Sequence, residues 1–376
     1  MPSIFKTLPH VPRDPILSLT LDFQADTREE KIDLSVGVYR DLHRSVPIMR
    51  AVKEAERLLI DREQTKSYLP IEGSRASIEP AEALLFGEVL AGQLQDRLFS
   101  AQALGGTGAL FIAGCLLKEA GVETIALPDP TWPNHKNIFP HAGLSLATYK
   151  HGDVESVASL PQGTAVLFHG CCHNPTGLDP SREEWQQLSQ IVRDSGLIPV
   201  FDIAYQGFGD GLEQDAASIR LFAEAGHEMV VAQSYSKNFG LYGERAGTLF
   251  VLSGEGTVPG VVKRSIRSTY SNPPIHSLSI VGTVLRDAEL CSLWESELAA
   301  MRERLHQIRT KLGEALGRPE LLQERGMFSY LGLTKEQVER LKAEFAIYTA
   351  GGGRINISGL SDETLPRFIE AMRVIG

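Results

Sequence analysis

Five short apolar runs, separated by segments with helical patterning, constrain the fold of this chain more than any other feature. They begin near residues 124, 165, 198, 229 and 248. Apolar runs of this length, bounded by turns, are typical of strands that are buried on both faces. Strands that alternate with helices predict an α/β fold with a mostly parallel sheet covered on both sides. Because such sheets bind ligands at the carboxyl ends of their strands, polar residues there are the first candidates for function.

Lys237 lies in residues 233–247 (QSYSKNFGLYGERAG), between the fourth and fifth runs. A lysine buried at a strand end favours its neutral amine, and a neutral amine attacks carbonyl groups to form a Schiff base. For an arbitrary Ser-Lys pair, a solvated loop lysine is the commoner case. Here, however, Ser234, Ser236 and Arg245 are close in the sequence, and these are groups that a phosphate neighbour would require.

A second phosphate signal is the glycine-rich start of an apolar helix at residues 105–109 (GGTGA). Free N–H groups and the helix dipole favour an anion at such a position. The segment has neither the Lys-Ser/Thr ending of an NTPase loop nor the spacing of a dinucleotide fingerprint. Taken alone, it could serve helix packing only. With Ser234 and Arg245 downstream, a phosphate bound at Gly106 and Thr107 is the favoured interpretation.

Asp202 stands inside the apolar run that begins at residue 198. A buried carboxylate is costly unless it is paired, so Asp202 needs a partner. A protonated pyridine nitrogen would serve, although a salt bridge or a helix cap is an equal alternative from this segment alone. Tyr205 follows three residues later, and its hydroxyl could reach a phenolic oxygen on the same pyridine ligand. Asp202 and Lys237 both fall near the carboxyl ends of strands, which predicts that they lie together.

Two further motifs are residues 131–135 (TWPNH) and residues 174–177 (NPTG). Together with the segments above, and in the same order, they resemble class I aminotransferases of fold type I, in the aspartate and aromatic aminotransferase subgroup. The resemblance extends from Asp14 to the C-terminal segment. It implies pyridoxal 5′-phosphate as the cofactor. It also implies a large domain with a mostly parallel, seven-stranded type of sheet and a small α/β domain.

The resemblance and the patterning together predict the domain limits. We expect an N-terminal arm and part of the small domain over residues 1–45, the large cofactor-binding domain over residues 46–300, and the small C-terminal domain over residues 301–376. Within these, residues 32–39 read as a strand interrupted at Gly37, where the backbone could approach a ligand closely. Ser361 is expected to cap the last helix.

Each matched residue takes a role that the resemblance implies. Lys237, Asp202 and Tyr205 would be catalytic, with Lys237 bonded to the cofactor and Asp202 supported by His135. The expected cofactor-binding residues are Gly106, Thr107, Trp132, His135, Asn174, Asp202, Tyr205, Ser234, Lys237, Arg245 and, from a neighbouring subunit, Tyr68. The expected substrate-binding residues are Gly37, Trp132, Asn174, Arg354 on the α-carboxylate and, from the neighbouring subunit, Arg267 on a distal carboxylate.

The implied reaction moves an amino group between an L-amino acid and 2-oxoglutarate by a ping-pong mechanism. The donor is ambiguous, because residues 131–135 and 169–172 (HGCC) look aspartate-type. Residues 68–73 (YLPIEG) and 241–245 (LYGER) instead look like the aromatic enzymes.

Alternatives remain open at this point. They are an aromatic-specific or specialised-pathway aminotransferase, another pyridoxal phosphate reaction such as β-elimination or decarboxylation, and a non-catalytic nucleotide-binding protein. Residues 150–164 and 254–262 look shortened relative to the family.

Bulk composition limits the other classes of function. The net charge of −10 argues against a nucleic-acid surface, and no apolar stretch approaches the roughly 20 residues that span a bilayer. The four cysteines show neither a disulfide framework nor metal-site spacing. His169 and His173 lack accompanying ligands, so we expect no metal. No signal peptide is recognisable, so we expect a cytoplasmic protein that binds small molecules only. The resemblance implies that it is a homodimer with shared active sites.

Overall fold

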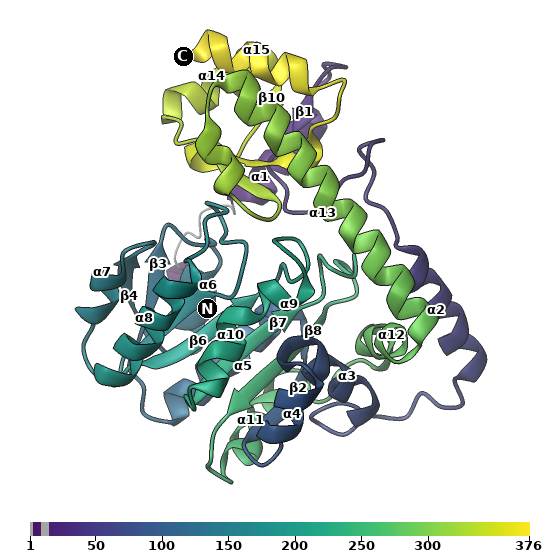
Figure 1. Ribbon diagram of the computed structural model, residues 1–376, viewed down its shortest axis with the longest axis vertical. Coiled ribbons are helices and arrows are strands. Elements are labelled where there is room, and N and C mark those ends of the chain that lie inside the picture. The colour runs from purple at the N-terminus through teal and green to yellow at the C-terminus, as the bar shows by residue number, and fades with distance from the viewer. Residues whose placement is uncertain (1–2, 9–14) are drawn as a thin grey trace.

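The computed structural model describes residues 3–8 and 15–376, so Asp14 lies outside the described residues. Its centre is a seven-stranded sheet in the order β2-β8-β7-β6-β5-β3-β4 (Figure 1). Strand β8 runs antiparallel to both of its neighbours, and the other strands share one direction. The predicted α/β fold with a mostly parallel sheet is therefore confirmed. The strands are β2 (Leu98–Leu104), β3 (Thr124–Asp129), β4 (Ser145–Lys150), β5 (Ala165–His169), β6 (Ile198–Ile203), β7 (Met229–Ser234) and β8 (Ala246–Leu252).

Successive residues of the central strands enter two separate cores, one on each face of the sheet. Phe168, Phe201 and Phe250 belong to one core, whereas Leu167 and Val200 belong to the other. This alternation follows from the two-residue period of a strand, and burial on both faces explains why the runs are continuously apolar. The first core is covered by α3 (Arg75–Phe86), α8 (Arg182–Asp194), α10 (Ala217–Glu224) and α12 (Ile275–Arg286). The second is covered by α5 (Gly105–Glu119), α6 (His135–His141) and α11 (Val258–Thr269).

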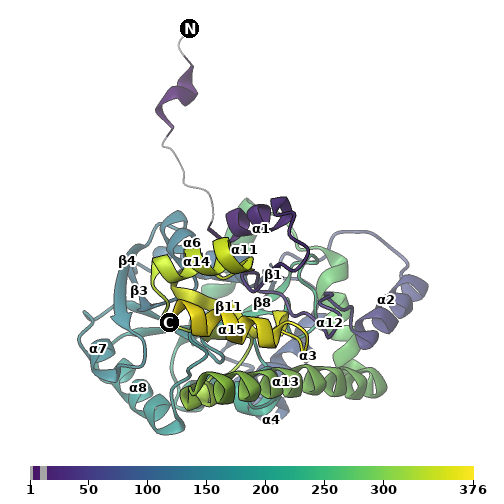
Figure 2. The same ribbon diagram turned by 90° about the horizontal axis from the view of Figure 1, so that it is seen from above.

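Helix α13 (Ala288–Leu316) connects the sheet body to the C-terminal part of the chain (Figures 1 and 2). The Asp287 carboxylate accepts two N–H groups at its start, and Gly317 ends it with a φ of 65°, a left-handed conformation that glycine adopts without strain. In the C-terminal part, β9 (Phe328–Tyr330) pairs antiparallel with β11 (Arg354–Asn356). Strand β10 (Ile347–Tyr348) pairs parallel with β1 (Ile32–Asp33), so the N-terminal segment joins this part. The domain limits at residues 45 and 300 stay predictions.

The remaining elements are short or peripheral. They are α1 (Pro15–Ala25), α2 (Arg50–Arg62), α4 (Glu88–Leu94), α7 (Val154–Ala158), α9 (Leu212–Asp215), α14 (Lys335–Phe345), α15 (Leu365–Ile375) and the 3₁₀ turns η1 (Ile4–Thr7), η2 (Pro319–Gln323), η3 (Gly351–Gly353) and η4 (Ile357–Gly359). Over the residues that the structure describes, no helix is both long enough and apolar enough to cross a membrane.

One local prediction was wrong. The expected strand over residues 32–39 is only two residues long, because the backbone carbonyls of its later residues accept hydrogen bonds from side chains instead of from a neighbouring strand. The Asn356 amide donates to the carbonyls of Val36 and Val38, both at 2.7 Å, and Arg354 donates to Ser35 O at 2.6 Å. Ser361, the expected cap of the last helix, lies in the turn that leads into Leu365. Its Oγ accepts the backbone N–H of Thr364 at 3.4 Å, and its carbonyl accepts that of Leu365 at 2.8 Å, as a capping residue does.

Candidate active site

A cavity of about 210 Å³ opens at the carboxyl ends of strands β5, β6 and β7. It contains most of the site residues predicted from the sequence. The lining residues are Gly37, Gly106, Thr107, Leu110, Trp132, His169, Cys171, Asn174, Asp202, Ala204, Tyr205, Ser234, Ser236, Lys237, Tyr242 and Arg245. The topology explains this convergence, because parallel strands bring their carboxyl ends to one edge of the sheet.

A chain of hydrogen bonds ends at Asp202, and its direction can be deduced from its first donor. The backbone N–H of Asn174 donates to His169 Nδ1 at 3.2 Å, so neutral His169 carries its proton on Nε2. That nitrogen lies 3.3 Å from Thr131 Oγ1, which lies 2.9 Å from His135 Nδ1. His135 is therefore left with its proton on Nε2, and it donates to Asp202 Oδ2 at 3.1 Å.

This chain keeps Asp202 ionised despite its position inside the protein. Burial by itself would raise the pKa of the Asp202 carboxyl, but the hydrogen bond from His135, together with the positive charge of Lys237, brings the pKa below its ordinary value. Asp202 is thus an anion that faces the cavity. His135 stands behind Asp202, fully buried, and does not itself line the cavity.

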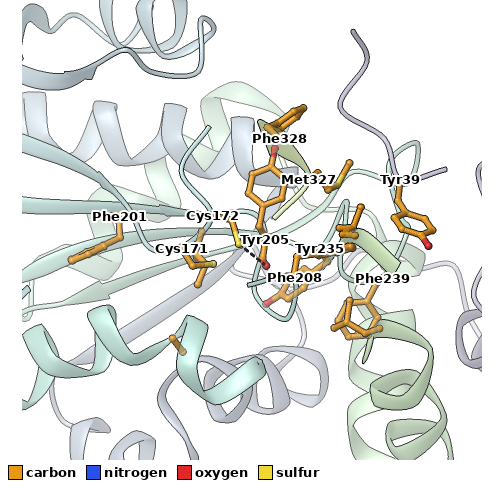
Figure 3. Packing of buried hydrophobic residues seen from close by; sticks show 14 of the residues in the cluster. Tyr39, Cys171, Cys172, Phe201, Tyr205, Phe208, Tyr235, Phe239, Met327 and Phe328 are labelled. Carbon is orange, nitrogen blue, oxygen red and sulfur yellow. Dashed lines mark hydrogen bonds between the residues drawn. The ribbon is translucent and has the colours of Figure 1, made fainter. Parts of the chain in front are cut away.

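Lys237 presents an amine that is easily deprotonated. Burial, reinforced by the charges of Arg245 and Arg354 and opposed by that of Asp202, lowers its pKa to about 8. Its Nζ lies 5.0 Å from the centroid of the Tyr205 ring. Burial also raises the pKa of Tyr205, so this phenol keeps its proton at neutral pH. Figure 3 shows Tyr205 beside Cys172 and Phe328, and the Phe328 ring meets it edge-on at 6.0 Å.

One end of the cavity is built for an anion. Helix α5 begins there, so its first N–H groups are free to bind a ligand. A Cβ on Gly106 would come within 3.0 Å of Ser234 Cβ, so the glycine permits this close approach. Arg245 adds a positive charge, and its guanidinium donates a hydrogen bond to the carbonyl of Tyr242 at 3.0 Å. Together with Thr107, these groups match what the sequence predicted for a phosphate.

Arg354 lies against the other end, where it contacts Asn174. Its guanidinium donates to Asn174 Oδ1 at 3.3 Å and to the Ser35 carbonyl at 2.6 Å, and it lies over the Phe328 ring at 4.4 Å. Its Nε is buried and has no hydrogen-bond partner within the described part of the chain. A buried guanidinium nitrogen without a partner is costly, so a carboxylate ligand would complete this group.

Tyr68 and Arg267 do not join the cavity. Tyr68 is 87% exposed, and Arg267 points to the side chains of Ser271 and Asn272. Neither residue lines the cavity. The structure of one chain thus brings together all of the predicted site residues except these two, for which the resemblance implies a role in the neighbouring subunit.

The sequence reasoning missed Tyr242, Leu110 and Thr131. Tyr242 lies between Lys237 and Arg245 in one motif, so its position in the loop was the available signal. Its hydroxyl accepts the backbone N–H of Tyr39 at 2.8 Å and so ties this loop to the N-terminal segment. Leu110 and Thr131 stand beside predicted residues, but nothing in their type distinguishes them from ordinary core residues.

Cys171, Cys172 and Asp215 form the one described group whose geometry could hold a metal ion, with potential ligand atoms within 4.8 Å of one another. Their chemistry argues against it. Burial raises the pKa of both thiols, and metals bind thiolates. The Asp215 oxygens already accept the N–H groups of residues 207, 209 and 210 at 2.7, 2.9 and 2.8 Å. Asp215 therefore holds the loop that follows β6.

Comparison with known proteins agrees with this geometry. The family described as "Aminotransferase class I and II" matches residues 29–372. The aspartate aminotransferase of Haemophilus influenzae is 42% identical and covers 98% of this chain and 99% of its own. The aromatic-amino-acid aminotransferase of Pseudomonas aeruginosa is 41% identical, with 98% of both chains covered. The crystal structure of the Burkholderia pseudomallei aromatic-amino-acid aminotransferase, covalently bound to pyridoxal phosphate, matches at 39% identity and a TM-score of 0.95, over 99% of both chains.

The alignment with the Haemophilus influenzae enzyme spans 392 positions, more than the 376 residues of this chain. That relative therefore contains segments that this chain lacks, and the places of shortening expected at residues 150–164 and 254–262 stay predictions.

The residues of the cavity fit pyridoxal phosphate. The α5 N-terminus with Ser234 and Arg245 suits its phosphate, the anionic Asp202 suits its ring nitrogen, and the low pKa of Lys237 suits a covalent bond to its aldehyde. The half-buried Trp132 lines the same cavity. With this fit and a family match along nearly its whole length, the chain belongs to the class I and II aminotransferases and is a pyridoxal phosphate-dependent transaminase.

Proposed function

We propose that the protein exchanges the amino group of L-aspartate, an aromatic L-amino acid, or both with 2-oxoglutarate, and that it works as a cytoplasmic homodimer with shared active sites. The observation that carries the substrate assignment is the buried, incompletely bonded Arg354 beside Asn174. It supports binding of an α-carboxylate at the edge of a cavity that holds a reactive amine and an anion. The names of the similar proteins support both donors.

In this proposal, bound pyridoxal phosphate supplies an electron-accepting ring, and the side chains direct the chemistry. Arg354, with Asn174, fixes the substrate α-carboxylate and so orients the Cα–H bond. Asp202 holds a proton at the ring nitrogen. Lys237, as a neutral amine, would take the proton from the substrate α-carbon and deliver it to C4′, the cofactor carbon that carried the aldehyde, so that the amino group stays with the cofactor. Tyr205, which keeps its proton at neutral pH, serves as a hydrogen-bond donor.

The second carboxylate of a dicarboxylic substrate requires another cation. Arg267 is the proposed partner, and it must come from a second copy because it does not line the cavity of its own chain. Tyr68 would reach the same neighbouring site, at the cofactor phosphate. An aromatic donor lacks the second carboxylate, so Arg267 would matter less for that donor than for aspartate.

The visible spectrum tests the donor. Purified protein with bound cofactor would be mixed with aspartate and, separately, with tyrosine, without an acceptor. Conversion of the cofactor to its amino form by aspartate alone would make this an aspartate aminotransferase, and conversion by both would make it a broad or aromatic enzyme. Conversion by neither would refute the proposed donors, although the cofactor band would persist.

Subunit complementation tests the shared sites. In a hybrid of Lys237→Ala and Arg267→Ala chains, one site carries both defects and the other carries neither. Mixing the two variants and allowing the chains to reassort should therefore restore about a quarter of the wild-type aspartate rate, because about half of the dimers are hybrids with one intact site. If Lys237 and Arg267 served the same site from one chain, mixing would restore nothing.

A further inference from the structure

A column of three imidazoles ends at the wall of the cofactor cavity. The rings of His151 and His173 are stacked with centroids 3.5 Å apart and an angle of 7° between their planes. The His173 ring in turn lies 4.4 Å from that of His169, at 44°. Of the three, only His169 lines the cavity. The functions described above use His169 but leave the outermost ring, His151, without a role.

His151 follows β4 and is tied to two other elements. Its backbone N–H donates to Asp129 O at the end of β3, at 3.2 Å. Its ring Nε2 lies 2.8 Å from the carbonyl of Leu178, so this nitrogen carries a proton and donates it. His151 thus touches the loop that follows β5 twice, at the ring of His173 and at the carbonyl of Leu178. Asn174 lies between these two contacts.

The ring of His173 depends on its two stacked neighbours for its orientation. Its Nδ1 lies 2.8 Å from Thr176 Oγ1, whereas its Nε2 is buried with no hydrogen-bond partner among the described residues. A ring bonded through one nitrogen can still rotate, so contacts with its faces must hold it. The rings of His151 and His169 both contact it. A face-to-face pair is not the arrangement that aromatic rings favour by themselves, so the bonds to Leu178 and Thr176 hold the two rings together.

The column is electrically neutral. Burial lowers the pKa of His151 and of His173, and it lowers that of His169 to about 3. Neutral rings can stack at this distance, whereas two imidazolium ions would repel each other. Behind β5, His151 and His169 also border a second cavity of about 30 Å³, the space of about one water molecule. Removing the His151 ring would therefore give the His173 ring room to move away from the site.

We propose that His151 is a positioning residue for Asn174. It holds the His173 ring and the Leu178 carbonyl, and so fixes the segment between them. That segment carries the Asn174 N–H that bonds His169 and the Asn174 amide that bonds Arg354. The inference rests on the proposed function, in which Asn174 and Arg354 hold the substrate α-carboxylate.

Three substitutions separate the two contacts of His151. His151→Ala removes both, His151→Phe keeps an aromatic face without the N–H donor, and His151→Gln keeps a donor without the face. We expect the alanine variant to raise the KM for the amino donor about 10-fold, the effect of weakening one hydrogen bond to a charged group, with kcat changed less than about 3-fold. The phenylalanine variant should recover most of this loss. His306→Ala, at an exposed position on α13, is the matched control.

Histidine NMR of the cofactor-free protein gives a readout that does not depend on turnover. The groups around His173 are the rings of His151, His169 and His135, the Thr176 hydroxyl, the carbonyl of Pro130 and the Asp179 carboxylate, which accepts the backbone N–H of His173 at 2.9 Å. In the wild type we expect the ¹⁵N signals of His173 and His169 not to titrate between pH 5 and pH 8. In His151→Ala, His173 should gain contact with water and titrate in this range, whereas His151→Phe should keep it neutral.

Two outcomes would overturn the inference. One is an unchanged KM together with unchanged histidine signals, and the other is a lowered Tm as the only effect of all three substitutions. Should the alanine variant fail to fold, the comparison of the phenylalanine and glutamine variants decides the matter alone. Asn174→Ala separates this inference from the proposed function. If Asn174→Ala leaves the KM unchanged, the carboxylate role itself is refuted, whereas a raised KM there with a normal KM in the His151 variants refutes only the role of His151.

Discussion

Replacing Lys237 by methionine should stabilise the cofactor-free protein at neutral pH. The amine is buried, and its pKa falls from the ordinary 10.5 to about 8, because burial and the charges of Arg245 and Arg354 outweigh the attraction of Asp202. A difference of this size corresponds to about 3 kcal/mol at 1.36 kcal/mol per pH unit. The folded chain therefore carries a penalty of this order whenever Lys237 is protonated in both the folded and the unfolded chain.

The pH window follows from the sign of the shift. Below pH 8 the folded and the unfolded chain both bind the proton, and the full penalty opposes folding. Between pH 8 and pH 10.5 the unfolded chain binds a proton that the folded chain has released, so the stability of the wild type rises with pH. Above pH 10.5 the amine is neutral in both states and the penalty is gone.

Urea unfolding at pH 7 and at pH 10.5 measures this effect. Lys237→Met should raise the free energy of unfolding by about 2 to 3 kcal/mol at pH 7 and by little at pH 10.5, at one fixed protein concentration. Lys335→Met, at an exposed position at the start of α14, serves as the control and should change neither value. An equal gain in the free energy of unfolding at both pH values, or a loss of stability at pH 7, would refute the conclusion that burial lowers the pKa of Lys237.

Three further predictions concern the chemistry. Asp202→Asn should keep the cofactor but lower kcat on the order of 100-fold or more, because a preorganised charge at the reacting ring is lost; a steady-state rate near the wild type would contradict this. Arg354→Lys should raise the KM of every amino donor about 10-fold or more, since an ammonium cannot replace the planar fork of a guanidinium, as initial-rate measurements would show. Arg267→Ala should raise the KM for aspartate far more than that for tyrosine. Equal effects on both donors would refute the proposed contact between Arg267 and the distal carboxylate.

The strands that the sequence predicted are those whose burial on both faces leaves a continuous apolar run. Two strands of the seven-stranded sheet were not predicted, and each has a physical reason. Strand β4 lies at the edge of the sheet with most of its residues exposed or half-buried, so it has no apolar run. Strand β2 is buried but carries Ser100 and Gln102, and the Gln102 amide finds its partner at Pro274 O, 172 residues away. A polar residue that is satisfied by such a distant contact looks exposed from its local sequence.

The proposed catalytic residues were predictable because strand ends converge, and their supporting contacts were not. Asp202 and Lys237 are recognisable in the sequence because each is a charged residue that interrupts or follows an apolar run. Thr131 is different, since its hydroxyl matters only because two histidine rings from separate segments approach it. The stacking of His151 on His173 likewise joins two loops whose sequences carry no sign of contact. Chemistry can be inferred from residue type and local burial, whereas positioning depends on contacts between distant segments.

The surface position of Tyr68 and Arg267 supports a shared-site dimer through the residue that joins them. Asn272 lies 3.3 Å from the Arg267 guanidinium through its Oδ1, and its Nδ2 donates to the carbonyl of Leu69, next to Tyr68, at 2.8 Å. One amide thus holds both segments together on the outside of the chain. For Tyr68 and Arg267 to serve the same neighbouring cavity, they must lie on one part of the surface, because a single rigid contact between subunits would position both residues. In the proposed dimer, Asn272 would hold Arg267 and the segment that carries Tyr68 in one orientation toward the neighbouring cavity.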